Sequence, residues 1–122
     1  MRLPARTLLF LALPLLLVVS ACRDAHVNVT VENQTGASID LLEVDYPSAS
    51  FGADSLAAGA SYHYLIQVRL DGPVKVQYSE HASHKLRQMT GPDLHEGQQG
   101  QLEIVLLPDG KAEFHPQLTP QQ

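Results

Sequence analysis

Apolar and polar residues alternate with a period of two along most of the chain after residue 25. Val27, Val29 and Val31, for example, are separated by polar residues. This period places successive side chains on opposite faces of a β-sheet, whereas an amphipathic helix repeats every 3.6 residues. Similar patterns predict strands over the segments 39–46, 51–56, 62–70, 74–78, 102–107 and 111–115. Gly, Pro, Asn and Asp between these segments are typical of turns, so we expect an all-β fold.

Several strands can be placed in a sheet from their own residues. The segment 102–107 is mostly apolar on both faces, which is typical of a central strand. The segment 51–56 and the last strand are expected at sheet edges. The segments 62–70 and 74–78 flank the turn sequence Asp71-Gly72-Pro73 and predict a hairpin.

The alternation is interrupted at two places. At Leu41-Leu42 it changes phase, which indicates a β-bulge or a bend. The segment 91–100 is rich in Gly and polar residues and predicts the longest loop of the domain. Loops on rigid sandwiches often carry binding, but a plain connection between strands is the favoured interpretation. Tyr62, Tyr64 and Tyr78 share the inward phase, so we expect them in the core rather than on a sugar-stacking surface.

The predicted elements resemble an immunoglobulin-like or fibronectin-III-like β-sandwich. Such domains contain about seven or more short strands with turn signals every 8–12 residues. The resemblance implies a small antiparallel β-sandwich as the fold class. With no Trp and one Cys in the sequence, the core Trp and the inter-sheet Cys pair of antibody domains are absent.

The amino terminus has a different composition from the rest. Arg2 and Arg6 precede an apolar run over residues 7–19, and small residues follow at Ser20-Ala21. This three-part organisation is typical of a signal peptide that is removed after export. The apolar run is too short for a permanent transmembrane helix, which needs about 20 residues.

The sequence Val19-Ser20-Ala21-Cys22 resembles the lipobox of bacterial lipoproteins. The resemblance implies cleavage after Ala21 and acyl chains on Cys22, which would anchor the protein to a membrane of the cell envelope. More than one chain is needed, because a single myristoyl chain binds membranes with an association constant of only about 10⁴ M⁻¹. In such proteins, Asp directly after the cysteine favours retention in the inner membrane. Here Arg23 follows Cys22, which resembles the pattern of proteins sorted to the outer membrane. We therefore expect the protein to be on the outer membrane, facing the periplasm. The alternative is an ordinary secretory signal that ends beside a free Cys.

These features divide the chain into four parts. They are a cleaved signal peptide (1–21), the acylated cysteine with a short tether (22–25), a β-sandwich domain (26–116) and a flexible tail (117–122). The formal net charge of the full chain is −5, and loss of the two arginines of the signal peptide makes it more negative by two. This balance argues against nucleic acid as a partner, since clustered Lys and Arg bind phosphates. It offers no basic patch for anionic headgroups, so lipid is the expected membrane contact.

Six histidines raise metal binding as an alternative function. His81, His84 and His95 lie in or beside a polar stretch with Met89 between them, and imidazole with thioether ligands suits copper. Their spacing matches no established metal motif, and no carboxylate is clearly placed to orient the imidazoles. We therefore expect no cofactor, and a periplasmic copper- or zinc-binding protein remains the alternative.

Catalysis is not expected from this sequence. The one Cys is assigned to lipid, and no Gly-x-Ser-x-Gly elbow occurs. Glu43 and Asp45 lie two apart on a polar strand face, where a solvated pair is favoured over a glycosidase pair. The sequence thus predicts a lipid-anchored envelope protein whose β-sandwich is a non-catalytic interaction or structural module with a protein partner in the envelope.

Overall fold

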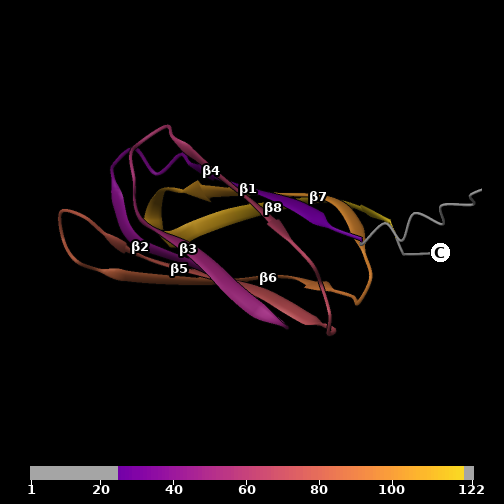
Figure 1. Ribbon diagram of the computed structural model, residues 1–122. Helices are drawn as coiled ribbons and strands as arrows, with labels where there is room; N and C mark the ends of the chain where they lie inside the picture. Colours follow the sequence, from indigo (N-terminus) through magenta and orange to yellow (C-terminus); the bar gives the residue numbers. More distant parts are fainter. Residues whose placement is uncertain (1–24, 120–122) are drawn as a thin grey trace, which may run out of the picture.

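Two four-stranded sheets face each other in the computed structural model, which describes residues 25–119 (Figure 1). One sheet has the strand order β4-β1-β7-β8 and the other β3-β2-β5-β6. The all-β sandwich predicted by the alternation is confirmed. The elements are β1 (Val27–Asn33), β2 (Ile39–Tyr46), β3 (Ala49–Leu56), β4 (Ser61–Ile66), β5 (Gly72–Glu80), β6 (Leu86–Leu94), β7 (Gln99–Leu107), the 3₁₀ turn η1 (Pro108–Gly110) and β8 (Lys111–Thr119).

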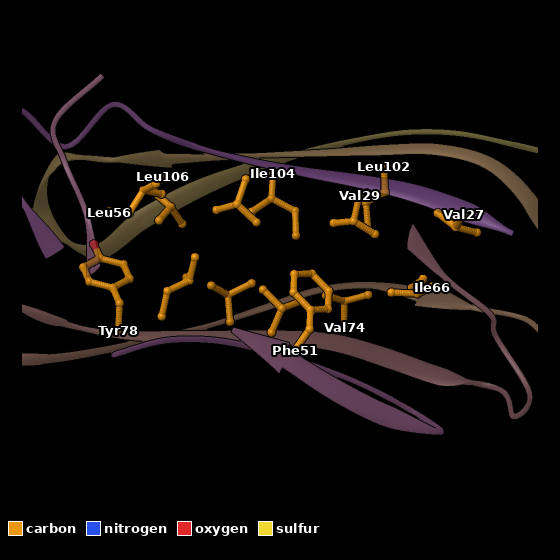
Figure 2. Packing of buried hydrophobic residues seen from close by; sticks show 14 of the residues in the cluster. Val27, Val29, Phe51, Leu56, Ile66, Val74, Tyr78, Leu102, Ile104 and Leu106 are labelled. Atoms are coloured by element: carbon orange, nitrogen blue, oxygen red, sulfur yellow. The ribbon is translucent and has the colours of Figure 1, made fainter. Parts of the chain in front are cut away.

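The core lies between the sheets and is built from the inward residues of the strands (Figure 2). In the view of Figure 2, Leu102, Ile104 and Leu106 of β7 line one layer, and Val74 and Tyr78 of β5 line the other. All five side chains are almost completely buried. Full burial of one aliphatic side chain stabilises a fold by about 1.5–3 kcal/mol, so this double layer is the main source of the sandwich's stability.

The central position of β7 is confirmed. β1 and β8 flank β7 in its sheet, with β1 parallel and β8 antiparallel to it. Val105 points to the outer side of that sheet and is nevertheless buried, as expected for a strand with apolar residues on both faces. The other strand pairs of the described residues are antiparallel.

The predicted hairpin of the segments 62–70 and 74–78 is wrong. β4 pairs with β1, whereas β5 pairs with β2 and β6 in the opposite sheet. The connection 67–71 therefore crosses the sandwich, and its Val68 is buried in the core. A turn sequence indicates where a strand ends but does not say which sheet the next strand joins.

The predicted bulge at Leu41-Leu42 is confirmed. The register between β2 and β5 shifts between Asp40 and Glu43. Leu41 has a φ of 53°, in the left-handed region that is uncommon for residues other than glycine. The extra residue lets Ile39 and Leu42, which flank the bulge, both enter the core.

The predicted loop over residues 91–100 is mostly a strand. β6 continues to Leu94, which is completely buried, and only residues 95–98 form the turn to β7. Gly91 allows this because a Cβ there would lie 2.5 Å from the Phe114 ring of β8. Pro92 is accommodated where the register with β5 shifts, on an edge strand. The segment has the residues of a loop but the position of an edge strand.

The last strand is longer than its pattern indicates. β8 ends at Thr119, which pairs with Gln99, so residues 117–119 belong to the sheet. The predicted signal peptide (1–21) and Cys22 lie outside the described residues. Within residues 25–119, no helix has the length and apolar character needed to cross a membrane.

Candidate functional site

The sandwich has two sides on which edge strands of opposite sheets run close together. On the first side, β6 and β8 each contain a proline, Pro92 and Pro116. Proline has no N–H to offer a further strand, and natural edges use it to prevent unwanted pairing. The Phe114 ring against Gly91 also closes this side. The β6–β8 side is therefore protected against the addition of a strand.

The second side, formed by β3 and β4, lacks such protection. Neither strand contains a proline; β3 carries one charged residue, the exposed Asp54, and β4 (SYHYLI) contains no Asp, Glu, Lys or Arg. Tyr64 is 43% exposed and Leu65 is 55% exposed. Because neighbouring residues of a strand point to opposite faces, β4 offers one large apolar side chain on each face of its edge.

Four aromatic rings connect the two sheets on the β3–β4 side. The rings of Phe51 and Tyr64 are nearly parallel, with centroids 4.6 Å apart and an interplanar angle of 8°. The ring centroids of Tyr62 and Tyr46 lie 6.2 Å and 6.3 Å, respectively, from the ring centroid of Phe51. Stacked pairs of this kind contribute about 0.5–1.5 kcal/mol beyond their buried area. This aromatic cluster (Tyr46, Phe51, Tyr62 and Tyr64) holds the two unprotected edges together.

The expected core position of the tyrosines is confirmed for one of the three. Tyr78 is buried and Tyr62 is partly buried, but Tyr64 is exposed. An inward phase buries a side chain only where another strand covers it, and β4 is an edge strand. Burial, and to a smaller extent the neighbouring Tyr64, raises the pKa of Tyr46.

The four candidate metal ligands are not brought together. His81 and His84 lie between β5 and β6, Met89 lies within β6, and His95 follows its other end. A strand of nine residues is about 30 Å long at about 3.3 Å per residue. His81 Nδ1 lies 2.7 Å from Asp40 Oδ2, and His95 Nδ1 lies 3.6 Å from Asp71 Oδ2. Residues 25–119 contain no group of three His, Cys, Asp or Glu side chains suited to a metal ion.

Glu43 and Asp45 lie near each other on the outer face of β2. The negative charge of Asp45, then a hydrogen bond with Asp45 and partial burial, raise the pKa of Glu43. Glu43 Oε2 also accepts a hydrogen bond from Gln77 Nε2 at 2.9 Å. Both side chains are partly exposed on this face of the sheet.

Asp45→Asn is therefore expected to lower the pKa of Glu43 toward its ordinary value of 4.5. The reason is that the main cause of the increase, the charge of Asp45, is removed. Carboxyl chemical shifts followed by NMR through an acid titration measure this change. Asp54→Asn, on neighbouring β3, is the control and should leave Glu43 unchanged; the same Glu43 pKa in both variants would contradict the assigned cause.

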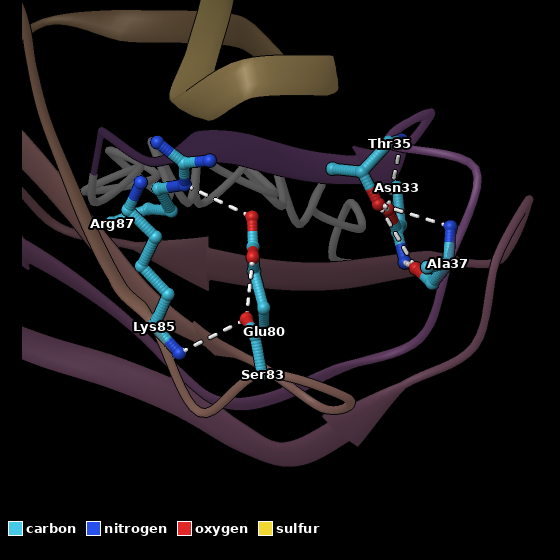
Figure 3. Close-up of polar contacts among 7 residues, drawn as sticks. All are labelled: Asn33, Thr35, Ala37, Glu80, Ser83, Lys85 and Arg87. Carbon is cyan, nitrogen blue, oxygen red and sulfur yellow. Dashed lines mark hydrogen bonds and ion pairs between the residues drawn. The ribbon is translucent and has the colours of Figure 1, made fainter.

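One end of the sandwich carries a dense polar network (Figure 3). Glu80 accepts hydrogen bonds from Ser83 Oγ at 2.7 Å and from Arg87 Nε at 3.0 Å. These two hydrogen bonds lower the pKa of Glu80, and the bond from Ser83 is the larger cause. A hollow of about 270 Å³ lies beside Glu80, Thr35 and Tyr78. The network orders the turn between β5 and β6, and its groups are engaged with one another.

A two-sheet β-sandwich with one unprotected side is the class of protein that these features define. No family model matches the chain, and no curated protein matches it. The chain is similar in structure to a protein from Eubacterium rectale solved by NMR, with a TM-score of 0.54 and 13% sequence identity. The match covers 80% of this chain and 90% of that one. At this identity the likeness shows the fold alone.

Proposed function

We propose that this chain is a lipid-anchored protein of the cell envelope whose β-sandwich is a non-catalytic interaction module. The partner supplies an extended segment that pairs with the β3–β4 side as an added strand. The proposal rests on a difference between the edge strands of the two sides. β6 and β8 each contain a proline, and β3 and β4 contain none.

The residues of β4 suit the addition of a strand. In this mode of recognition, main-chain hydrogen bonds supply affinity and alternate side chains supply specificity. Tyr64 and Leu65 are exposed on opposite faces of β4, so an added strand contacts one apolar residue on each face. The absence of formal charge on β4 avoids the desolvation cost that a Lys or Asp at the edge imposes.

The lipid anchor is proposed from the sequence around Cys22. Val19-Ser20-Ala21 has the apolar and small residues of a lipobox, and Cys22 is the one cysteine of the chain. In an exported protein a single unpaired thiol would otherwise remain reactive, and acylation accounts for its presence. Arg23 supports an outer-membrane location facing the periplasm. We include in this proposal the resemblance of the sandwich to immunoglobulin-like or fibronectin-III-like domains.

Crosslinking in cells tests the interaction site. Leu65 of β4 and Gln117 of β8 lie in the same row across their sheet, at opposite edges. A photocrosslinking residue at position 65 is expected to yield an adduct with an envelope protein, and the same residue at position 117 is the matched control. Adding Tyr64→Lys should lower the yield about tenfold, which corresponds to about 1.4 kcal/mol of binding free energy. Equal adducts at both edges, or an adduct at position 117 alone, would contradict the proposal.

Mass spectrometry of the mature amino-terminal peptide tests the anchor. The peptide is expected to begin at Cys22 and to carry acyl mass on it. A mature chain that begins before Cys22, or one with a free thiol in the aqueous phase after detergent partitioning, would overturn this part of the proposal.

A further inference from the structure

The start of β1 marks one end of the sandwich. Val27 pairs with Ile66, the last residue of β4, and with Gly100 near the start of β7. The connection 67–71 and the turn 95–98 therefore lie beside the first residues of the domain. We call this the tether end. Figure 1 shows β1 beginning at the same end as the connection between β4 and β5, with the turn between β5 and β6 at the opposite end.

The chain is held to the domain from its first described residue. Ala25 is buried, and the carbonyl oxygen of His26 accepts a hydrogen bond from the Gly100 N–H at 3.1 Å. Only Arg23 and Asp24 stand between Cys22 and Ala25. An extended chain spans at most about 3.5 Å per residue, so Cys22 lies within about 10 Å of Ala25. Acyl chains on Cys22 thus force the tether end toward the bilayer, whichever way the domain turns.

Leu70 projects from the tether end on an ordered connection. The side chain is 58% exposed, whereas Val68 two residues earlier is buried. The carbonyl oxygen of Val68 accepts a hydrogen bond from the Gly97 N–H at 3.0 Å, and the Arg69 N–H donates to Ser48 Oγ at 3.2 Å. These bonds attach the connection to two neighbouring turns, so the exposure of Leu70 is built into the fold.

The charges around Leu70 allow shallow insertion only. Asp71 Oδ1 accepts a hydrogen bond from the Glu96 N–H at 2.7 Å, and this bond is the main cause that lowers the pKa of Asp71. Asp71 is thus a carboxylate tied to the neighbouring turn, and its charge opposes entry of this end into the acyl region. Arg69 can lay its apolar stem along the bilayer surface with its guanidinium among the phosphates. One leucine in the acyl boundary contributes at most about 1.5–3 kcal/mol, which is enough only for a domain already held there by lipid.

We propose that the segment Arg69-Leu70 is a second contact with the lipid bilayer, which orients the domain with its tether end on the membrane. Single exposed leucines are common on protein surfaces, and this one differs because it stands on a connection at the tether end, whereas Leu41, Leu65 and Leu86 lie within strands. The inference rests on the acylation of Cys22. β4 then runs from Ser61, far from the membrane, to Ile66 at the tether end, so Tyr64 and Leu65 lie in its membrane-proximal half.

Tryptophan fluorescence tests this orientation, because the natural chain contains no Trp. Leu70→Trp and Leu86→Trp are prepared in the acylated protein and reconstituted into phosphatidylcholine vesicles with brominated acyl chains. Both leucines are 58% exposed, and Leu86 starts β6 at the opposite end, about 30 Å away along the strands. We expect Trp emission of the Leu70→Trp protein to lose more than half its intensity and that of the Leu86→Trp protein to be unchanged.

The outcomes separate the orientation from the anchor. Acyl mass on Cys22 with no quenching of Leu70→Trp, or with equal quenching of both variants, would overturn the orientation and leave the anchor standing. Absence of acyl mass would overturn the proposed anchor and with it the premise of this orientation, whereas the strand-addition proposal is decided by the crosslinking test. Amide hydrogen exchange of the unsubstituted acylated protein is a second measurement that does not depend on the folding of a variant. Slower exchange over residues 67–71 in vesicles than in detergent supports the proposal, and equal exchange contradicts it.

Discussion

Replacement of Asn33 by alanine is expected to lower the free energy of unfolding by about 2–4 kcal/mol. Asn33 is completely buried, and its Nδ2 donates hydrogen bonds to the carbonyl oxygens of Ala37, Leu56 and Ala57 at 2.8, 3.0 and 3.2 Å. Alanine would remove all three bonds, of which the bond to Leu56 is buried and those to Ala37 and Ala57 are partly buried. Urea unfolding followed by circular dichroism measures the loss.

The position of Asn33 relates this loss to the candidate site. Its Oδ1 accepts hydrogen bonds from the N–H and the hydroxyl of Thr35 at 3.0 and 2.7 Å (Figure 3). Its backbone N–H donates to the Ala60 carbonyl oxygen, and its own carbonyl oxygen accepts from the Gly59 N–H. One residue at the end of β1 thus holds the turn that joins β3 and β4, the two unprotected edges.

Gln34→Ala is the matched control for Asn33→Ala. Gln34 is the next residue, lies exposed, and makes one side-chain hydrogen bond, to Glu32 at 2.8 Å. Its replacement is expected to change stability by less than about 0.5 kcal/mol, as for most surface substitutions. Similar losses for the two variants would show that the buried amide is not the source of the effect.

Leu94→Ala is expected to lower the free energy of unfolding by about 2–5 kcal/mol, the usual cost of a cavity left by a buried leucine. Leu94 ends β6 and is completely buried among the core residues. The same unfolding measurement tests it.

Leu86→Ala, at the start of the same strand, serves as the control because that side chain is largely exposed. We expect a change below about 0.5 kcal/mol there. If Leu94→Ala were equally mild, the segment 91–94 would behave as the loop that its composition predicts and not as part of the core.

The difference between prediction and structure for the segment 91–100 has a clear physical cause. Gly91 and Pro92 are local turn signals, but on an edge strand a missing N–H leaves no neighbour unpaired. Gly91 serves instead as the place where the Phe114 ring of β8 fits. This role depends on a residue that lies more than twenty positions away in the chain, so no local pattern contains it.

The candidate site, like the segment 91–100, can be predicted from the sequence only in part. The segment 51–56 and the last strand are predicted as edges, and both lie there as β3 and β8. β4 as the unprotected edge is not predicted, because its sequence fits an inner strand of a hairpin equally well. The absence of proline and charge from β4 is visible in the sequence, but it acquires meaning only when the strand is known to lie at an edge.

The sequence by itself determined which side chains share a face of each strand and where β2 bulges, because a strand alternates its faces residue by residue. It also carries the lipobox-like segment on which the proposed anchor depends. Only the tertiary structure decided that β4 and β5 join different sheets, that Leu94 is core and Tyr64 is surface, and that Leu70 stands beside the start of β1. These outcomes depend on which distant strands pair, and pairing is chosen by the burial and hydrogen bonding of the whole sandwich rather than by any one segment.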